Sequence, residues 1–306
     1  MAGNQYISVG GVRIRYRSAG SGPALILVHG LVGSADNWRW NIDSWAQNAT
    51  VYSIDLANMG LSDRIFGLDA GQAATADRLA GFMDALGIAD ADIAGHSHGG
   101  AIAMMLAARH PERVRRLVLF APANPFCDAG RQLIKFYRTR VGSFFARVIP
   151  KLPRKVYEIS LGRMYGDPAR VAEGTLDGYT IGLNRVSVEH VMGIVRGWYD
   201  DMAALAQVLG KVAEKPALLI WGDRDRAVGV ASAARLCAAL PQARLLVLPG
   251  VGHVAFSEVP EICNLAVSEW LRDGSVAEVA TPVMGRSYAA VQRVGSGSWS
   301  SSTGSI

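Results

Sequence analysis

Short apolar runs alternate with longer helix-like segments along most of the chain, and this alternation limits the fold more than any other feature of the sequence. The run Ala24–Val28 is apolar at every position, as expected of a strand that is buried on both faces. Similar runs span residues 51–55, 92–95, 117–121, 217–221 and 244–248, and helical patterns such as 73–86, 101–109 and 230–239 lie between them. Alternating strands and helices predict an α/β fold, with a mostly parallel central sheet covered by helices on both faces.

Residues 126–205 interrupt this alternation, because they contain helical patterns without a strand-like run. Pro150, Pro153 and Pro168 divide the stretch into short helices, since proline ends or kinks a helix. We therefore predict a core made of residues 1–125 and 206–273, with residues 126–205 inserted as a helical cover over one end of the sheet. Residues 274–306 become almost entirely Ser and Gly towards their end and are predicted to form a flexible tail.

The composition indicates an ordinary globular protein, because 50% of the 306 residues are hydrophobic and 19% are charged. No apolar run approaches the roughly 20 residues that a membrane-spanning helix needs. The N-terminus lacks a basic stretch followed by an apolar one, so no secretory signal is visible and we expect a cytoplasmic location. The sequence leaves the oligomeric state open.

Metal ions, other cofactors and nucleic acids are not expected partners of this chain. Its three cysteines, Cys127, Cys237 and Cys263, are widely spaced, and it has neither a C-x-x-C pair nor an H-E-x-x-H helix. The net charge of +5 is modest for this length, and no signature of a nucleic-acid-binding fold accompanies it.

Nine basic residues are concentrated between residues 131 and 163, within the inserted segment. Apolar residues such as Phe136, Phe144 and Phe145 are interspersed with them. One interpretation is an amphipathic cover that turns its apolar side towards a pocket and its basic side towards water. The other is a peripheral contact between this basic cap and an anionic membrane, or a preference for acidic, amphipathic substrates.

The most specific motif is Gly95-His96-Ser97-His98-Gly99-Gly100, which follows a strand-like run and precedes a helix-forming one. It matches G-x-S-x-G in the strand–turn–helix context of a nucleophile elbow. A serine on such a turn points its hydroxyl outward, and glycines two positions away on either side leave the room that the turn needs. The motif indicates Ser97 as a nucleophile; the alternative is an incidental serine in a glycine-rich helix start.

The loop His29-Gly30-Leu31 follows the first buried strand. Such a loop can bring a backbone N–H towards the nucleophile, and the N–H groups of Leu31 and His98 are the predicted oxyanion hole. These donors would stabilise the negative charge that develops when Ser97 attacks an acyl carbonyl. The alternative for His29-Gly30 is a plain turn that ends the strand.

A carboxylate and a histidine follow later strands in the order that a serine triad needs. Asp225 comes after the run at 217–221, where a parallel strand brings a side chain to the ligand-binding edge of the sheet. His253 lies on a glycine-flanked loop after the run at 244–248, and its neutral imidazole can accept the serine proton. Asn124 and Asp128, which follow the run at 117–121, are the alternative positions for the acid.

From about residue 10 to about residue 273 the chain resembles the α/β-hydrolase superfamily, in its capped, serine-nucleophile branch of esterases and lipases. The matching segments are residues 28–30, 55–63, 95–100, 221–225, 252–253 and 258–261. The resemblance implies an α/β-hydrolase fold with residues 126–205 as a helical cap. It also implies Ser97 as nucleophile, His253 as base and Asp225, in preference to Asp223, as acid. Asp55-Leu-Ala-Asn58 departs from the family pattern, because many relatives carry a Pro-Gly pair there, but this changes a turn and leaves the triad intact.

These residues together predict a serine hydrolase that cleaves a carboxylic ester or lactone through an acyl-enzyme intermediate, with a small acyl compound as its partner. The residues predicted to contact the substrate are His29, Gly30, Asn37, Phe136 and Val254. The alternative is a C–C bond hydrolase that uses the same triad on a vinylogous diketone acid, with the acid group bound by a cap arginine such as Arg196 or by Asn37. A third possibility is a non-catalytic binding protein built on the same fold.

Overall fold

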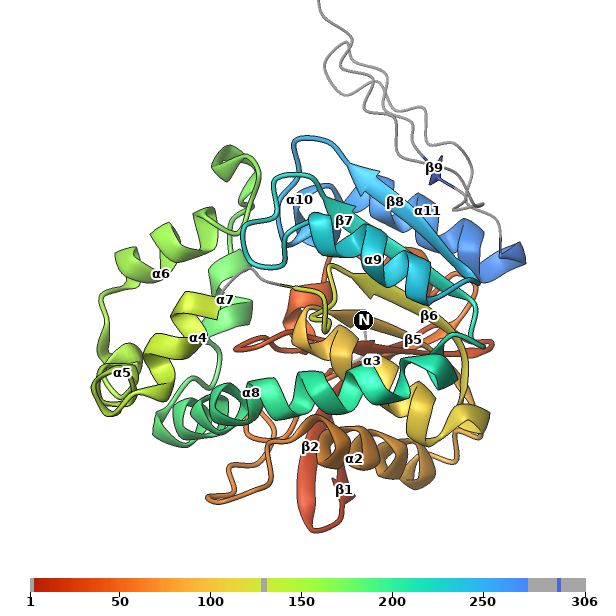
Figure 1. The fold of residues 1–306 in the computed structure, drawn as a ribbon. Coiled ribbons are helices and arrows are strands. Elements are labelled where there is room, and N and C mark those ends of the chain that lie inside the picture. The colour runs from red at the N-terminus through yellow and green to blue at the C-terminus, as the bar shows by residue number, and fades with distance from the viewer. Residues whose placement is uncertain (1–2, 128–130, 275–290, 293–306) are drawn as a thin grey trace, which may run out of the picture.

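One sheet runs through the middle of the molecule, with helices on both faces (Figure 1). The computed structural model describes residues 3–127, 131–274 and 291–292, and in this part of the chain nine strands form the sheet in the order β1-β2-β4-β3-β5-β6-β7-β8-β9. The strands are β1 (Gln5–Val9), β2 (Val12–Ala19), β3 (Ala24–Val28), β4 (Thr50–Ile54), β5 (Ala91–His96), β6 (Val114–Phe120), β7 (Ala217–Gly222), β8 (Ala243–Leu248) and β9 (Val291–Gln292). Strands β3 to β8 pair in parallel, whereas β1, β2 and β9 are antiparallel, so the predicted mostly parallel sheet is confirmed.

Two apolar cores lie on opposite faces of this sheet. The helices around them are α1 (Ile42–Trp45), α2 (Gln72–Ala85), α3 (His98–Arg109), α8 (Arg185–Val212), α9 (Ala231–Ala239), α10 (Ala255–Glu258) and α11 (Pro260–Asp273), with short 3₁₀ helices η1 (Ala35–Trp38) and η2 (Pro111–Arg113). Helices α2, α3, α8 and α9 contribute to the first core, and α1, α10 and α11 to the second.

Strand β3 shows why some runs in the sequence are apolar at every position. Ile26 and Val28 point into the first core, and Leu25 and Leu27 point into the second. All four side chains are fully buried, because neighbouring side chains of a strand face opposite sides of the sheet and both sides are covered here.

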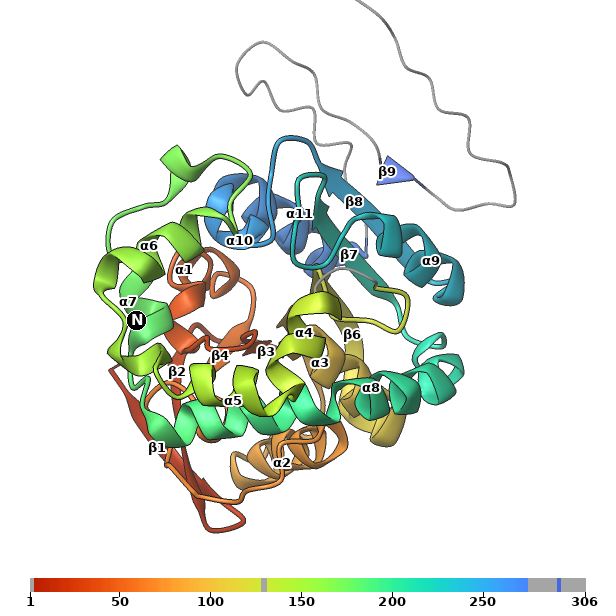
Figure 2. The same cartoon turned by 60° about the vertical axis from the view of Figure 1, so that its left-hand side comes forward.

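The inserted segment forms a helical cap beside one end of the sheet (Figure 2). It contains α4 (Arg131–Arg138), α5 (Arg140–Ala146), η3 (Ile149–Lys151), α6 (Arg154–Gly162), η4 (Pro168–Arg170) and α7 (Thr175–Thr180). Pro150 lies in η3, Pro153 precedes α6 and Pro168 begins η4, so the prolines divide the segment as predicted.

Helix α8 extends across residue 205, where the sequence predicts the boundary between the cap and the core. It runs unbroken from Arg185 to Val212, and Leu205, Leu209 and Val212 of its C-terminal part are buried in the first core. The helix is therefore shared between the cap and the core, because its amphipathic pattern continues past the expected boundary.

Most of the predicted tail lies outside the described residues. Val291 and Gln292 form β9, which pairs with Leu246 and Leu245 of β8, so this short part of the predicted tail extends the sheet. None of the described helices is long and apolar enough to cross a membrane.

Candidate active site

Ser97 lies on the sharp turn between β5 and α3, where the glycine motif predicts the nucleophile. Its φ of 52° and ψ of −119° are angles that a residue with a side chain rarely adopts, so the turn is strained. A Cβ on Gly95 would lie 2.6 Å from the carbonyl oxygen of Gly99, and a Cβ on Gly99 would clash with the carbonyl of His29. Only glycine fits at these two positions, which is the steric reason predicted for the motif.

Asp225 and His253 form a buried pair at the ends of β7 and β8. The Nδ1–H of His253 donates to Oδ2 of Asp225 at 2.7 Å. The other carboxylate oxygen accepts the backbone N–H groups of Ala227 at 2.8 Å and Val228 at 2.9 Å, which fixes the orientation of the carboxylate. This arrangement places the proton on Nδ1 and leaves Nε2 of His253 free to accept one.

The other candidate acids have different partners. Asp223 is exposed and its Oδ1 accepts the N–H of Gly250 at 2.7 Å, so it stabilises a turn in the histidine loop. The side chain of Asn124 closes a local turn by bonding the carbonyl of Pro122 and the N–H of Phe126. Asp128 lies outside the described residues. Among the candidates that the structure describes, Asp225 is the one bonded to the histidine.

His96 joins the turn of Ser97 to the loop of His253. Its Nε2–H donates to the backbone carbonyl of His253 at 3.1 Å, and the two ring centroids are 4.6 Å apart. Burial lowers the pKa of His96 well below its usual value, so the ring is neutral. Within the described residues the hydroxyl of Ser97 makes no hydrogen bond, and catalytic hydrogen bonds often tighten only when substrate binds.

The loop after β3 passes close to Ser97. A Cβ on Gly30 would lie 3.2 Å from the Cβ of Ser97 and 2.9 Å from Nδ1 of His96. Among the described residues, the N–H groups of Leu31 and His98 form no backbone hydrogen bond, and that of His98 is at the start of α3, where N–H groups have no helical acceptor. Both predicted oxyanion donors therefore lack a backbone acceptor, and the loop that carries one of them lies close to Ser97.

His29 fixes this loop from within the protein. Its Nδ1–H donates to the carbonyl of Gly30 at 2.7 Å, and its Nε2 accepts the N–H of Leu56 at 3.0 Å. The side chain is buried, and burial lowers the pKa of the imidazole, so it is neutral. With both ring nitrogens bonded to the backbone, none is left for the substrate contact that the sequence predicts.

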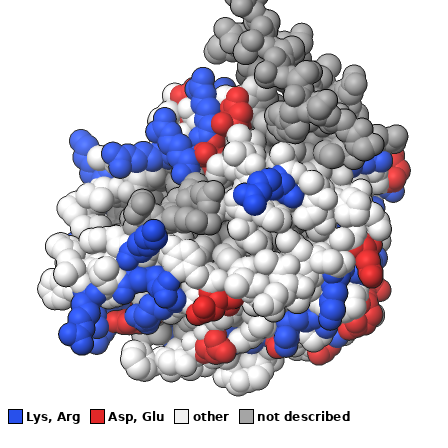
Figure 3. All heavy atoms as spheres, viewed as in Figure 1, with Lys and Arg blue, Asp and Glu red and all other residues white. Residues whose placement is uncertain are grey.

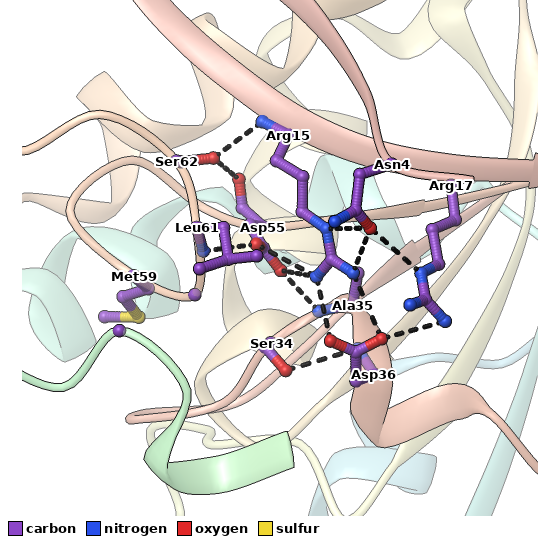
Figure 4. Close-up of polar contacts among 12 residues, drawn as sticks. Asn4, Arg15, Arg17, Ser34, Ala35, Asp36, Asp55, Met59, Leu61 and Ser62 are labelled. Carbon is purple, nitrogen blue, oxygen red and sulfur yellow. Dashed lines mark hydrogen bonds and ion pairs between the residues drawn. The ribbon is translucent and has the colours of Figure 1, made fainter. Parts of the chain in front are cut away.

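A buried ion pair holds the same loop from the other side (Figure 4). Asp55, directly after β4, accepts the N–H groups of Ala35 and Leu61, both at 2.6 Å, and the guanidinium of Arg15 at 3.2 Å. Arg15 comes from β2, is completely buried and also bonds Asp36 at 3.0 Å. One carboxylate therefore joins β2, the loop after β4 and the segment that follows the oxyanion donors.

Glu258 connects the histidine loop to the cap. Its buried carboxylate accepts the N–H of Gly252 at 2.8 Å and the cap N–H groups of Gly166 at 2.9 Å and Asp167 at 3.0 Å. Arg170 of the cap approaches the same carboxylate at 3.4 Å. The loop that carries His253 is thus connected to the cap through Glu258.

The sequence alone does not indicate these positioning roles of His96 and Glu258. Both act on groups that are distant in the sequence or belong to the backbone, and no spacing rule marks such contacts. The glutamate belongs to a segment that resembles the family, 258–261, and this resemblance was the available signal.

The remaining predicted substrate contacts are in different environments. Asn37 is buried in η1, where its Oδ1 accepts the N–H of Ser34, and its Nδ2 has no partner among the described residues. Val254 is fully buried in the second core, and Phe136 on α4 is 41% exposed. Contacts of these residues with a substrate stay predictions.

Helix α8 packs against α3, which begins directly after Ser97. The rings of His98 and Trp198 are 6.3 Å apart, and burial lowers the pKa of His98 to about 3, which keeps its ring neutral. Arg196, two residues before Trp198, is exposed and lines a cavity of about 160 Å³ with Asn58 and His190. Two residues on a helix differ in direction by about 200°, so Arg196 points away from the His98 side of α8.

The described residues contain no cluster of three or more His, Cys, Asp or Glu side chains that could hold a metal ion. The site combines a serine on a strained turn, two N–H groups without a backbone acceptor and a histidine oriented by a buried carboxylate.

Comparison with known proteins places this site in a family. The family model described as alpha/beta hydrolase fold matches residues 23–260. The chain belongs to the α/β-hydrolase family. This assignment agrees with the sheet order, the nucleophile turn and the cap, and it confirms the fold expected from the resemblance.

Three relatives show how this α/β-hydrolase compares with others. The dihydrolipoyllysine-residue acetyltransferase component of the acetoin cleaving system of Cupriavidus necator is 30% identical over 286 residues, which cover 88% of this chain and 69% of the relative. The structure of a meta-cleavage product hydrolase from Pseudomonas fluorescens is 25% identical, with a TM-score of 0.76 over 89% of this chain and 98% of that one. A bacterial membrane phospholipase A is also 25% identical, with a TM-score of 0.73 over 88% and 85% of the two chains.

Proposed function

We propose that this α/β-hydrolase cleaves a carboxylic ester or a lactone through an acyl-enzyme intermediate. The observation that supports the proposal most directly is the 2.7 Å hydrogen bond between Asp225 and His253, because it leaves Nε2 of the histidine available as a general base. A protein that used this fold only for binding would have no need of a buried, oriented Asp–His pair beside a strained serine.

The reaction follows from these positions in two halves. The Ser97 hydroxyl attacks the acyl carbonyl carbon while Nε2 of His253 takes its proton, and the N–H groups of Leu31 and His98 stabilise the resulting oxyanion. The intermediate collapses, the C–O bond breaks, and the leaving alkoxide takes the proton from His253. A water molecule, deprotonated by the same histidine, then attacks the acyl-serine and releases the carboxylic acid and the free hydroxyl.

Cleavage of a C–C bond is the second candidate, and the likeness to the meta-cleavage product hydrolase favours it. It uses the same triad but requires a group that binds the acid end of the substrate. Arg196, the cap arginine named as an example for that role, points away from the His98 side of α8. Asn37 stays available, because its Nδ2 has no partner among the described residues. The unsuitable position of Arg196 leads us to prefer the ester or lactone.

A panel of p-nitrophenyl esters of increasing acyl length, together with a lactone and a dienone acid, tests the proposal. We expect ester or lactone turnover in the native protein and a loss of about 10⁶-fold in kcat for Ser97→Ala. Ser160→Ala, which removes an exposed serine hydroxyl from the cap, is the matched control and should keep native turnover. Turnover of the dienone acid alone would establish the second candidate, and native activity in Ser97→Ala would refute both.

A further inference from the structure

The outer surface of the cap exposes large apolar side chains to water. Val141, Phe144, Phe145 and Ile159 are 59%, 65%, 54% and 52% exposed. Among the described residues they are four of the five large apolar side chains that are more than half exposed. Three of them, Val141, Phe144 and Phe145, lie together on α5. Scattered exposed apolar residues are normal on a protein surface, but a group of them indicates an interaction site.

The aromatic members of this group contact one another and stand on the surface together. The rings of Phe144 and Phe145 are 6.2 Å apart, and those of Phe136 and Phe145 are 6.4 Å apart. We call Phe136, Val141, Phe144 and Phe145 the apolar cap face. These exposed side chains are bulky and apolar, so they can insert into another apolar environment.

The same segment has a larger net positive charge than the whole chain. Residues 131–163 contain nine Lys and Arg residues and one Glu, a net charge of +8, whereas the whole chain carries +5 and the remainder is therefore at −3. Figure 3 shows blue side chains gathered over the cap around an uncharged area. Among the described residues, Lys135, Arg140, Lys151, Lys155 and Arg163 form no ion pair, so their charges are not neutralised within the molecule.

We propose that the apolar cap face docks on the surface of an anionic lipid bilayer. Such a surface has an outer layer of anionic headgroups and an apolar layer of acyl chains beneath it. The Lys and Arg side chains bind the headgroups, and the apolar side chains enter the boundary of the acyl chains. The contact is peripheral, because no described helix is long and apolar enough to cross the membrane. The proposal does not depend on which bond the active site cleaves.

Charge complementarity is the reason for choosing a bilayer over a second copy of the chain. A segment with a net charge of +8 would repel the same segment of a second copy, and the remainder at −3 is spread over a much longer sequence. An anionic bilayer instead offers many negative charges on a flat surface together with an apolar phase beneath them.

Vesicle co-sedimentation with the full chain tests the proposal. We expect binding to vesicles of phosphatidylcholine with 30% phosphatidylglycerol, weak binding to phosphatidylcholine alone, and weaker binding in high salt. Each basic residue near such a surface raises partitioning about five-fold, so Lys151→Glu with Lys155→Glu should lower it by at least about 25-fold. Phe144→Ser with Phe145→Ser should lower it by about 10-fold or more, because the apolar anchor is lost.

Matched variants separate this surface from general effects of charge and hydrophobicity. Lys211→Glu with Lys215→Glu changes the net charge equally at the far end of α8, and Phe66→Ser removes an exposed aromatic residue outside the cap. Both controls should bind anionic vesicles as the native chain does. Equal binding to neutral and anionic vesicles, or equal losses in control and cap variants, would overturn the proposal. So would a concentration-dependent dimer that Phe144→Ser abolishes, because it would assign the face to a second copy.

Discussion

At the scale of single residues, the two aspartates after β7 make a sharp test of the triad. Asp225→Asn keeps the shape of the side chain but can present an amide to Nδ1 of His253, which favours the wrong tautomer, so we expect kcat to fall by about 10⁴-fold. Asp223→Asn is the matched control, since its Oδ1 bonds the N–H of Gly250 and does not touch the histidine. Steady-state kinetics on the best ester of the panel measures both, and near-native turnover in Asp225→Asn would exclude this residue as the acid.

The same scale shows how far the sequence defines the site. Ser97, Asp225 and His253 are predictable because each follows a strand and all three occur in the order of a known triad. Arg15 is not predictable, because β2 alternates apolar and basic residues and this pattern places all its arginines in water. The structure buries Arg15 completely, since the 3₁₀ helix that begins 20 residues later covers that part of the strand.

At the scale of elements, the buried pair of Arg15 and Asp55 should stabilise the junction of β2 with the loops around the oxyanion donors. Arg15→Met leaves a buried carboxylate without its counter-ion, so we expect the free energy of unfolding to fall by about 3–5 kcal/mol. Urea unfolding at neutral pH measures the change. A decrease below about 1 kcal/mol would show that the N–H groups of Ala35 and Leu61 alone satisfy the carboxylate.

Strand β2 offers its own control for this prediction. Arg13 lies two residues before Arg15 and pairs with Asp63, but their side chains are 62% and 36% exposed. Arg13→Met removes the same kind of group from an ion pair in water, and exposed pairs contribute about 1 kcal/mol or less. The difference between the two variants therefore measures burial of the pair and not the loss of an arginine.

Strands and helices were predictable where all their residues lie in one environment. They were less predictable where one helix passes from the cap into the core. The strands β3 and β7 follow from runs that are apolar at every position, because both faces of the sheet are covered. Helix α8 was divided in the prediction at residue 205, since its N-terminal part belongs to the cap and its C-terminal part to the core. A sequence pattern reports which positions are apolar but not which layer each one contacts.

At the scale of the whole molecule, four buried neutral histidines should make the fold sensitive to acid. Burial lowers the pKa of His98 to about 3 and of His190 to about 4, and it also lowers the pKa values of His29 and His96. In the unfolded chain histidine titrates near 6.5, so between about pH 6.5 and 4 the unfolded state binds protons that the folded state excludes. The contribution of these neutral histidines to stability is therefore complete above pH 6.5 and is lost as the pH falls.

The slope of stability against pH tests this argument without depending on absolute stability. Each excluded proton costs about 1.4 kcal/mol per pH unit, so the native chain should lose several kcal/mol of unfolding free energy between pH 6.5 and 5. His190→Asn removes one such group and should lower the slope by about 1.4 kcal/mol per pH unit. Val188→Ala, two residues before His190 on α8, also opens a buried site but removes no titrating group, so it should lower stability at every pH and keep the native slope. Urea unfolding at pH 7, 6 and 5 compares the three chains, and a native slope in His190→Asn would show that this histidine accepts its proton within the fold.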